Sequence, residues 1–235
     1  MFATIRFVIN LFGYTVWYAG KAVLAALMRV PNLPGGTYDN ITRNWARGIL
    51  RGARIDARLA GWEKVPQESA VVFVSNHQSW FDIFVLAGLI PSHMRFVSKK
   101  ELSRIPLLGR AMSESGHIFI DRENRQRAFG AYDEAAEAIR QGTSAVVFPE
   151  GTRSQTGELQ PFKKGPFVLA IAAQVPVVPV YCAGTFTLLP KGTVRLTPHP
   201  VAAHFGDPIP TAGMTYDDRE ELMKSTRAAI EKLRE

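Results

Sequence analysis

A histidine and an aspartate five residues apart are the side chains of this sequence whose types and spacing most directly suggest chemistry. His77 and Asp82 form an HX4D motif directly after an apolar run. Histidine is the side chain best suited to accept a proton near neutral pH. An aspartate that reaches the other ring nitrogen would fix the tautomer and stabilise the imidazolium. Since the chain lacks a GxSxG motif and its only cysteine is Cys182, we expect the nucleophile to belong to the substrate.

A purely structural explanation of the same residues stays open. Ser79 and Asp82 have the spacing of a capping box, with aspartate in place of glutamate, which would only stabilise the start of a helix. His77 would then be an ordinary turn histidine. The choice between the two explanations depends on which other motifs the chain contains.

The pattern of apolar residues predicts the elements that would position this pair. An apolar strand ends just before His77, and a helix begins just after it. Short apolar runs continue to alternate with helical segments, which predicts a mixed, largely parallel α/β sheet flanked by helices. We expect strands over 55–60, 71–75, 95–98, 117–120, 145–148, 177–181 and 194–197, and helices over 79–90, 106–115, 125–140, 166–174 and 216–234.

The first thirty residues predict a membrane-embedded helix. Residues 7–28 are uncharged apart from Lys21 and predominantly apolar, and a bilayer-spanning helix needs about 20 predominantly apolar residues, so crossing would be marginal. Tyr14, Trp17 and Tyr18 are of the types favoured at the level of lipid headgroups. A secretory signal fits poorly, because no A-x-A cleavage site follows the apolar run.

A second helix is predicted over residues 38–52, after a break rich in proline and glycine. Arg43, Arg47 and Arg51 fall on one side of it, and apolar residues fall on the other. Two explanations stay open: the helix lies in the membrane interface with its arginines on phosphates, or it packs on the domain with a solvated arginine stripe. We therefore divide the chain into membrane-associated helices over 1–53 and a catalytic domain over 54–235.

Composition narrows the possible partners. A chain of 235 residues with 46% hydrophobic residues can bury one substantial core. The single cysteine excludes an intramolecular disulfide. The net charge of +7 favours an anionic partner, or simply a solvated basic surface. Without a Lys/Arg block or zinc-ligand spacing, we expect anionic phospholipid and a phosphorylated substrate, with no nucleic acid and no metal.

Further blocks accompany the histidine motif in a fixed order. They are KKEL at 99–102, IPLLG at 105–109, GHIFIDR at 116–122, FPEGTRS at 148–154 and VPVVPV at 175–180. With these blocks the chain resembles the glycerolipid acyltransferase family, specifically the bacterial 1-acyl-sn-glycerol-3-phosphate acyltransferases. The resemblance covers roughly residues 65–185.

This resemblance implies an activity and a site. The activity is transfer of a fatty acyl group from acyl-CoA or acyl carrier protein to the sn-2 hydroxyl of lysophosphatidic acid, giving phosphatidic acid for phospholipid synthesis. His77 and Asp82 would be catalytic. A substrate-binding role is expected for Lys99, Arg122, Glu150, Gly151, Thr152 and Arg153. No cofactor is expected beyond the acyl donor as co-substrate, and the expected location is the cytoplasmic face of the bacterial inner membrane.

Other functions remain compatible with the same residues. A sister enzyme would acylate another lysolipid or glycerol 3-phosphate. A non-catalytic membrane module would use the pocket only to hold lipid, although such a binder needs no base. Hydrolysis, with His77 activating water, is a weaker third possibility.

Overall fold

The computed structural model describes residues 2–121 and 125–235. In them, seven strands form one sheet in the order β1-β7-β6-β2-β5-β3-β4. The strands are β1 (Ala57–Ala60), β2 (Val72–Ser75), β3 (Met94–Lys99), β4 (Ile118–Ile120), β5 (Ser144–Val147), β6 (Val177–Ala183) and β7 (Val201–Phe205).

Five of the strands run in one direction. The β2–β5, β2–β6, β3–β5 and β3–β4 pairs are parallel, whereas β7 pairs antiparallel with β6 and parallel with β1. The mixed, largely parallel sheet is therefore confirmed. Because β2, β5 and β3 are neighbours and parallel, their carboxyl ends meet at one edge, where α/β proteins place their ligands.

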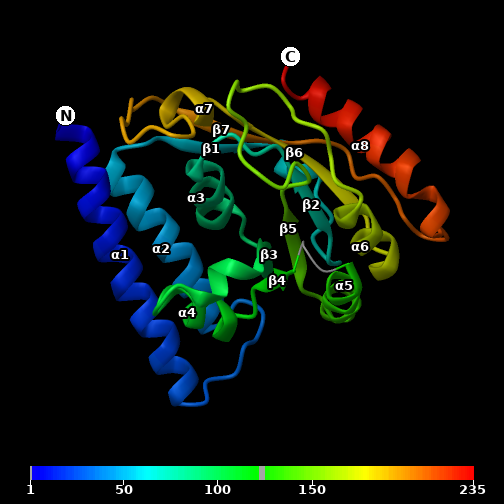
Figure 1. Cartoon of the computed structure of the whole chain (residues 1–235), viewed down its shortest axis with the longest axis horizontal. Coiled ribbons are helices and arrows are strands. Elements are labelled where there is room, and N and C mark those ends of the chain that lie inside the picture. Colours follow the sequence, from blue (N-terminus) through cyan, green and yellow to red (C-terminus); the bar gives the residue numbers. More distant parts are fainter. Residues whose placement is uncertain (1, 122–124) are drawn as a thin grey trace.

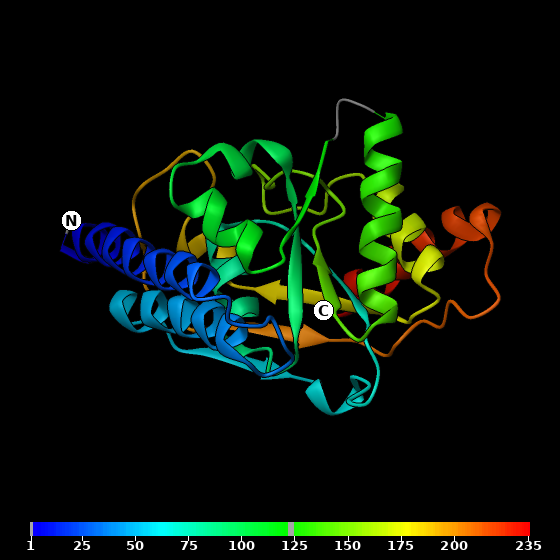
Figure 2. The same ribbon diagram turned by 90° about the horizontal axis from the view of Figure 1, so that it is seen from below.

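Helices cover both faces of the sheet (Figure 1). One side carries α1 (Phe2–Leu27), α2 (Thr37–Ala53), α3 (Trp80–Leu89) and α4 (Leu108–Glu114), and the other carries α5 (Arg125–Arg140), α6 (Gly165–Ala173) and α8 (Arg219–Lys232). The short helix α7 (Thr185–Leu188) and 3-10 turns at Trp62–Lys64, Lys100–Arg104 and Tyr216–Asp218 complete the regular structure. Figure 2 shows α1 and α2 lying side by side at one end of the molecule.

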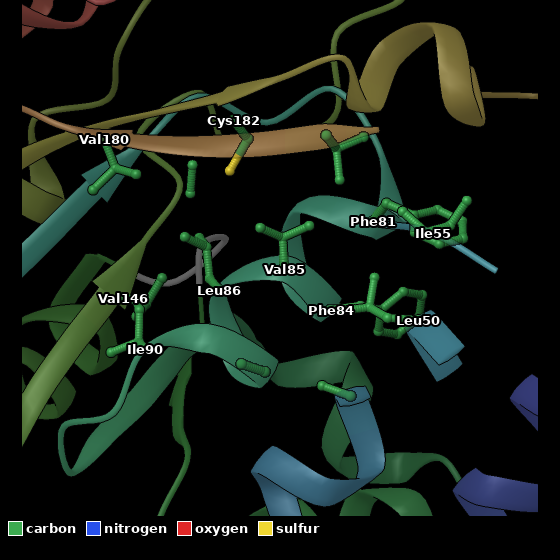
Figure 3. Close-up of a cluster of buried hydrophobic side chains, with 14 of the residues drawn as sticks. Leu50, Ile55, Phe81, Phe84, Val85, Leu86, Ile90, Val146, Val180 and Cys182 are labelled. Atoms are coloured by element: carbon green, nitrogen blue, oxygen red, sulfur yellow. The ribbon is translucent and has the colours of Figure 1, made fainter. Parts of the chain in front are cut away.

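A hydrophobic core fills each face. On the α3 side, Phe81, Val85 and Leu86 of α3 pack between Leu50 of α2 and Val180 of β6 (Figure 3). This core also contains Cys182, which is fully buried, as expected of a small core residue. On the other face, residues of α5, α6 and α8 pack against the alternate side chains of the same strands. The sheet is thus rigid at the edge that bears His77.

The N-terminal helices are joined to the domain by close packing. An added Cβ at Gly48 would lie 2.7 Å from the ring of Tyr14, and one at Gly52 would lie 2.4 Å from the side chain of Asn10, so α1 and α2 approach closely only because α2 has glycine there. Phe7 enters the α3-side core. In the described part of the chain, no helix has both the length and the apolarity that crossing a bilayer requires.

The arginines of α2 are not a solvated stripe. Arg47 Nε donates to the carbonyl oxygen of Gly88 at 2.7 Å, and Arg43 Nη2 donates to that of Pro91 at 2.9 Å. These carbonyls belong to the last turn of α3 and the segment after it, which lack helical partners. Arg51 is exposed. Of the two explanations, packing on the domain is therefore correct for α2, but two of its three arginines act within the protein.

One predicted strand is wrong. Residues 194–197 form no strand, and the seventh strand of the described sheet is β7 at Val201–Phe205. The alternation at 194–197 misleads because Val194 is 76% exposed, while Leu196 is buried in the core and its N–H donates to Thr4 Oγ1 at 3.1 Å. In β7 the buried positions do alternate, but alanines dilute the pattern.

Candidate active site

His77 and Asp82 meet at the carboxyl edge of the sheet. β2 ends at Ser75, and its direction delivers His77 two residues later beside the first turn of α3. His77 Nδ1 lies 2.8 Å from Asp82 Oδ2. The His77 side chain is 14% exposed and that of Asp82 is fully buried. The imidazole is therefore held at Nδ1 by a buried carboxylate, and part of the ring remains open to solvent.

Asp82 both caps α3 and holds the histidine. Its Oδ2 accepts the backbone N–H groups of Gln78 at 2.7 Å and Ser79 at 2.8 Å, and Ser79 Oγ in turn accepts the N–H of Phe81 at 3.3 Å. The capping box is confirmed, and the same side chain also makes the contact with His77 that the catalytic explanation requires. With Asp82 accepting at Nδ1, neutral His77 carries its proton there, so Nε2 is the nitrogen that can accept a proton.

The loop after β5 fixes the backbone of His77. Glu150 Oε1 accepts the N–H of His77 at 2.7 Å, and Ser154 N–H donates to the carbonyl of His77 at 2.7 Å. Gly151 makes this loop possible, since its φ of 75° is left-handed and its N–H closes a turn on Phe148 O at 3.1 Å. The HX4D and FPEGTRS segments therefore form one unit.

Glu150 joins its own loop to the segments of His77 and Gln160. Its second oxygen, Oε2, accepts the N–H of Gln160 at 3.1 Å. The side chain is buried, which raises the pKa of Glu150 above its ordinary value, although the N–H groups of His77 and Gln160 oppose that shift. Both carboxylate oxygens are occupied by the protein itself, so direct substrate binding by Glu150 stays a prediction.

Phe148 covers one face of the imidazole. The two rings are stacked with centroids 4.0 Å apart and planes inclined by 17°. Phe96 stacks behind Phe148 at 6.3 Å. Because these aromatic rings cover one side of His77, a ligand group that reaches Nε2 must approach from the open edge.

Arg153 offers a cation beside the histidine. Its guanidinium lies over the ring of Trp80, 5.1 Å from the centroid. Burial lowers the pKa of Arg153, and Asp82 opposes that shift, but an arginine remains charged at neutral pH. Among the described residues, no ion pair includes Arg153. This arrangement fits a site that holds an anion.

Thr152 lies next to Arg153 on the loop and is exposed. Lys99, also exposed, ends β3, which only β5 separates from β2 in the sheet. Its neighbour Lys100 is paired with Asp121 at 3.2 Å, so Lys99 is the more available of the two lysines. Arg122 lies outside the described residues. The structure thus brings five predicted site residues around His77, with Lys99 at the end of a nearby strand.

Some residues that hold the site were not predicted. Asn76 extends the pairing of β2 with β6, since its Oδ1 accepts the N–H of Cys182 at 2.6 Å. Gln78 Nε2 donates to Gly157 O at 2.6 Å. Lys191 Nζ donates to Thr152 Oγ1 at 3.2 Å and to Arg153 O at 3.1 Å. Asn76 and Gln78 flank His77, so their position beside the HX4D motif could have indicated a role at the site. Lys191 lies in a loop without any motif.

Within the described ranges, no cluster of three or more histidine, cysteine, aspartate or glutamate side chains forms a metal site. Fold and geometry define a class: an α/β protein with a carboxylate-held histidine and cationic side chains at the carboxyl edge of its sheet. The family model described as Acyltransferase matches residues 56–183, more than half of the sequence. The chain belongs to this acyltransferase family.

Named relatives agree with this assignment. A 1-acyl-sn-glycerol-3-phosphate acyltransferase of Limnanthes douglasii is 39% identical over 171 residues, which are 72% of this chain and 60% of that protein. The human 1-acyl-sn-glycerol-3-phosphate acyltransferase alpha is 35% identical over 182 residues, or 77% of this chain and 64% of that one. The chain thus spans less than two thirds of the length of these curated relatives.

A solved structure matches almost the whole chain. The crystal structure of the 1-acyl-sn-glycerophosphate (LPA) acyltransferase PlsC from Thermotoga maritima superimposes with a TM-score of 0.76 and 27% sequence identity. The match covers 99% of this chain and 95% of that one, so it includes the two N-terminal helices as well as the sheet.

Proposed function

We propose that this protein transfers a fatty acyl group from a thioester donor, acyl-CoA or acyl carrier protein, to the sn-2 hydroxyl of lysophosphatidic acid. The observation that carries the proposal is the 2.8 Å contact between His77 Nδ1 and Asp82 Oδ2 beside the Arg153 guanidinium. The names of the relatives supply the acceptor.

In the proposed reaction, His77 Nε2 removes the proton of the sn-2 hydroxyl as its oxygen attacks the thioester carbonyl. The oxygen–carbon bond forms, the carbon–sulfur bond breaks, and the imidazolium returns its proton to the leaving thiolate. Asp82 stabilises the imidazolium in between, as carboxylates do in comparable triads. General-base assistance of this kind contributes about 10²- to 10⁴-fold to the rate.

Substrate binding falls to the cations at the edge of the sheet. A guanidinium can hold a phosphate through two parallel hydrogen bonds, and Arg153 forms no ion pair among the described residues. Lys99 is proposed to assist from the end of β3, and the same binding role is proposed for Arg122, which lies outside the described residues. Thr152 and Gly151 are proposed to shape the loop against the acceptor.

The acceptor is a membrane lipid, and α1 offers a surface for reaching it. One side of α1 exposes large apolar side chains, among them Ile9 at 66%, Phe12 at 73% and Trp17 at 61%. Contiguous apolar surface of this kind marks a protein or membrane contact. We propose that this face enters the headgroup region of the cytoplasmic side of the bacterial inner membrane, where soluble donors are available.

The test is an acceptor-by-donor matrix with purified protein in mixed vesicles. We expect acyl transfer to lysophosphatidic acid in preference to other lysolipids and glycerol 3-phosphate. His77→Ala should lower kcat at least about a hundredfold, the lower end of general-base contributions, in a protein that still folds. Normal turnover in a folded His77→Ala protein would refute the role of the base, and binding of lipid without transfer by the unchanged protein would favour a lipid-binding module.

A further inference from the structure

Lys191 is a cation at the site that no motif marks. It lies beyond the matched family region, in the turn that follows α7. The turn is built for a fixed position: Thr193 N–H closes it on Pro190 O at 3.2 Å, and Gly192 takes the left-handed φ of 85° that such a turn requires.

The turn is tied to the histidine motif. Leu188 and Leu189 are buried in the core, and the carbonyl of Leu189 accepts Ser79 Oγ at 2.8 Å. Ser79 is the residue that begins α3 and whose N–H binds Asp82. The base of the turn is thereby held to the same helix start that carries the predicted catalytic pair.

The ammonium of Lys191 is aimed at the loop that bears Arg153. It donates to Thr152 Oγ1 at 3.2 Å and to Arg153 O at 3.1 Å. An ammonium has three N–H donors, so one remains for a ligand. No ion pair among the described residues includes Lys191.

Lys191 and Arg153 thus bring two cations to one loop, and neither forms an ion pair among the described residues. The nearest acidic groups of the site are otherwise engaged: Asp82 holds His77 and two backbone N–H groups, and Glu150 accepts those of His77 and Gln160. An anion bound at this loop would be attracted by both charges. The arrangement fits a small ligand with more than one negative charge.

We infer that Lys191 is a specificity-determining residue which, together with Arg153, selects acceptors with a phosphate monoester over those with a phosphate diester. A monoester carries about −1.5 to −2 charges at pH 7 and has three terminal oxygens, whereas a diester carries one charge and has two. The guanidinium supplies a planar fork and the ammonium a point charge from a second segment. This inference rests on the proposed acyl transfer to a lysophospholipid.

The test compares lysophosphatidic acid with its phosphate methyl ester, which keeps the acyl glycerol but is a diester. For the unchanged protein, we expect a KM for the monoester at least about tenfold below that for the methyl ester, as a charge-assisted hydrogen bond allows. In Lys191→Met, KM for the monoester should rise about tenfold and that for the diester little, with kcat and donor KM nearly constant. Lys191→Arg should recover part of the preference.

The control is Lys224→Met, which removes the same charge from the exposed surface of α8. It should leave the ratio of the two KM values unchanged. The pH profile gives a second readout: 1/KM for the monoester should rise as its second ionisation, near pH 6, is completed, and Lys191→Met should flatten that rise. A purely structural role would change neither the ratio nor the profile.

Equal losses on both acceptors in a folded Lys191→Met protein, or a retained monoester preference, would overturn the inference. Direct binding of the two lipids, measured without donor, separates this outcome from failure of the proposed function. If the protein transfers no acyl group yet still binds the monoester more tightly, and Lys191→Met abolishes that difference, the role of Lys191 stands and the transferase proposal falls.

Discussion

Single residues in this site serve folding and chemistry at once, and Glu150 shows how closely the two are joined. One of its oxygens accepts the N–H of His77 and the other that of Gln160. A neutral glutamine would point an NH2 group at one of these donors. The position of the predicted catalytic histidine thus depends on a carboxylate more than seventy residues away in the sequence.

We therefore expect Glu150→Gln to lower the free energy of unfolding by about 1–3 kcal/mol, because a buried donor loses its acceptor. It should also lower kcat, since the His77 backbone shifts. Glu158→Gln is the matched control on the same loop, where an exposed pair with Arg234 contributes about 0–1 kcal/mol. Urea unfolding and steady-state kinetics measure both effects; equal behaviour of the two variants would contradict the bracing role.

His117 predicts a specific loss of stability in acid. Its Nδ1 accepts the N–H of Phe96 at 3.0 Å, and burial, with Arg95 nearby, lowers the pKa of His117 from 6.5 to about 3. Above pH 6.5 both folded and unfolded states are neutral here. Between pH 6.5 and 3 only the unfolded state takes up the proton, so stability falls by up to about 1.4 kcal/mol per pH unit.

His117→Asn should remove this slope, because an amide oxygen can accept the Phe96 N–H but does not titrate in that range. The measurement is the free energy of unfolding in urea at several pH values between 7 and 4. His199→Asn, in a loop, serves as the control and should keep the slope of the unchanged protein. A slope that survives in His117→Asn would assign the acid sensitivity to other groups.

The sequence allowed the local half of the site to be predicted and not the long-range half. His77 and Asp82 are five residues apart on a strand-to-helix junction, so their contact follows from local geometry. The hydrogen bond from the His77 N–H to Glu150 could be predicted only if it were known which strands are neighbours in the sheet. Lys191 reaches the site from a loop with no periodic pattern, so nothing in its surroundings could have indicated its contact with Thr152.

At the level of elements, features that follow from local sequence were predicted, whereas features that depend on packing against distant segments were missed. Dense runs of apolar residues predict α3 and β2, and their predicted positions are confirmed to within a residue or two. β7 was missed because alanines occupy two of its five positions. The hydrogen bonds from Arg43 and Arg47 to backbone carbonyls were not predicted. A helical pattern shows which residues share a face of the helix, but it does not show which segment packs against that face.

The contacts of α2 make a prediction that distinguishes its arginines. Arg47→Met keeps the aliphatic stem but removes the donor to Gly88 O, so we expect a loss of about 0.5–1.5 kcal/mol in the free energy of unfolding. Arg51→Met, on the exposed side, should leave stability unchanged and weaken binding to anionic vesicles by about 1 kcal/mol at low salt. Thermal unfolding and vesicle sedimentation would measure these; a stable Arg47→Met protein with weakened vesicle binding would reverse the assignment.

At the scale of the whole molecule, the exposed apolar side of α1 predicts how the protein meets its acceptor. Ile9→Asn with Phe12→Asn should release the protein from vesicles by about tenfold or more, given the apolar surface of the two side chains. Transfer to vesicle-borne lysophosphatidic acid should fall in parallel. Transfer to acceptor in detergent micelles should change far less, because the catalytic edge is untouched.

Tyr216→Asn provides the control for that experiment. Tyr216 is 44% exposed, but it lies in the turn before α8, on the opposite side of the sheet from α1. We expect it to bind vesicles as the unchanged protein does. Release of both proteins to the same extent would show that general surface polarity, and not the α1 face, governs the association.

The central place of β2 in the sheet has a consequence for the order in which the molecule is built. Val72 of β2, the strand that leads to His77, pairs with Ala145 on one side and with Val177 on the other. The first of these partners follows roughly seventy residues later in the chain and the second roughly a hundred residues later, so β2 is synthesised well before either neighbouring strand. During synthesis from the N-terminus, its backbone N–H and C=O groups lack strand partners and its apolar side chains lack a core over that interval, when aggregation competes with folding. The HX4D motif is therefore synthesised early, but the candidate site around it can form only after β6 and the turn of Lys191 have left the ribosome.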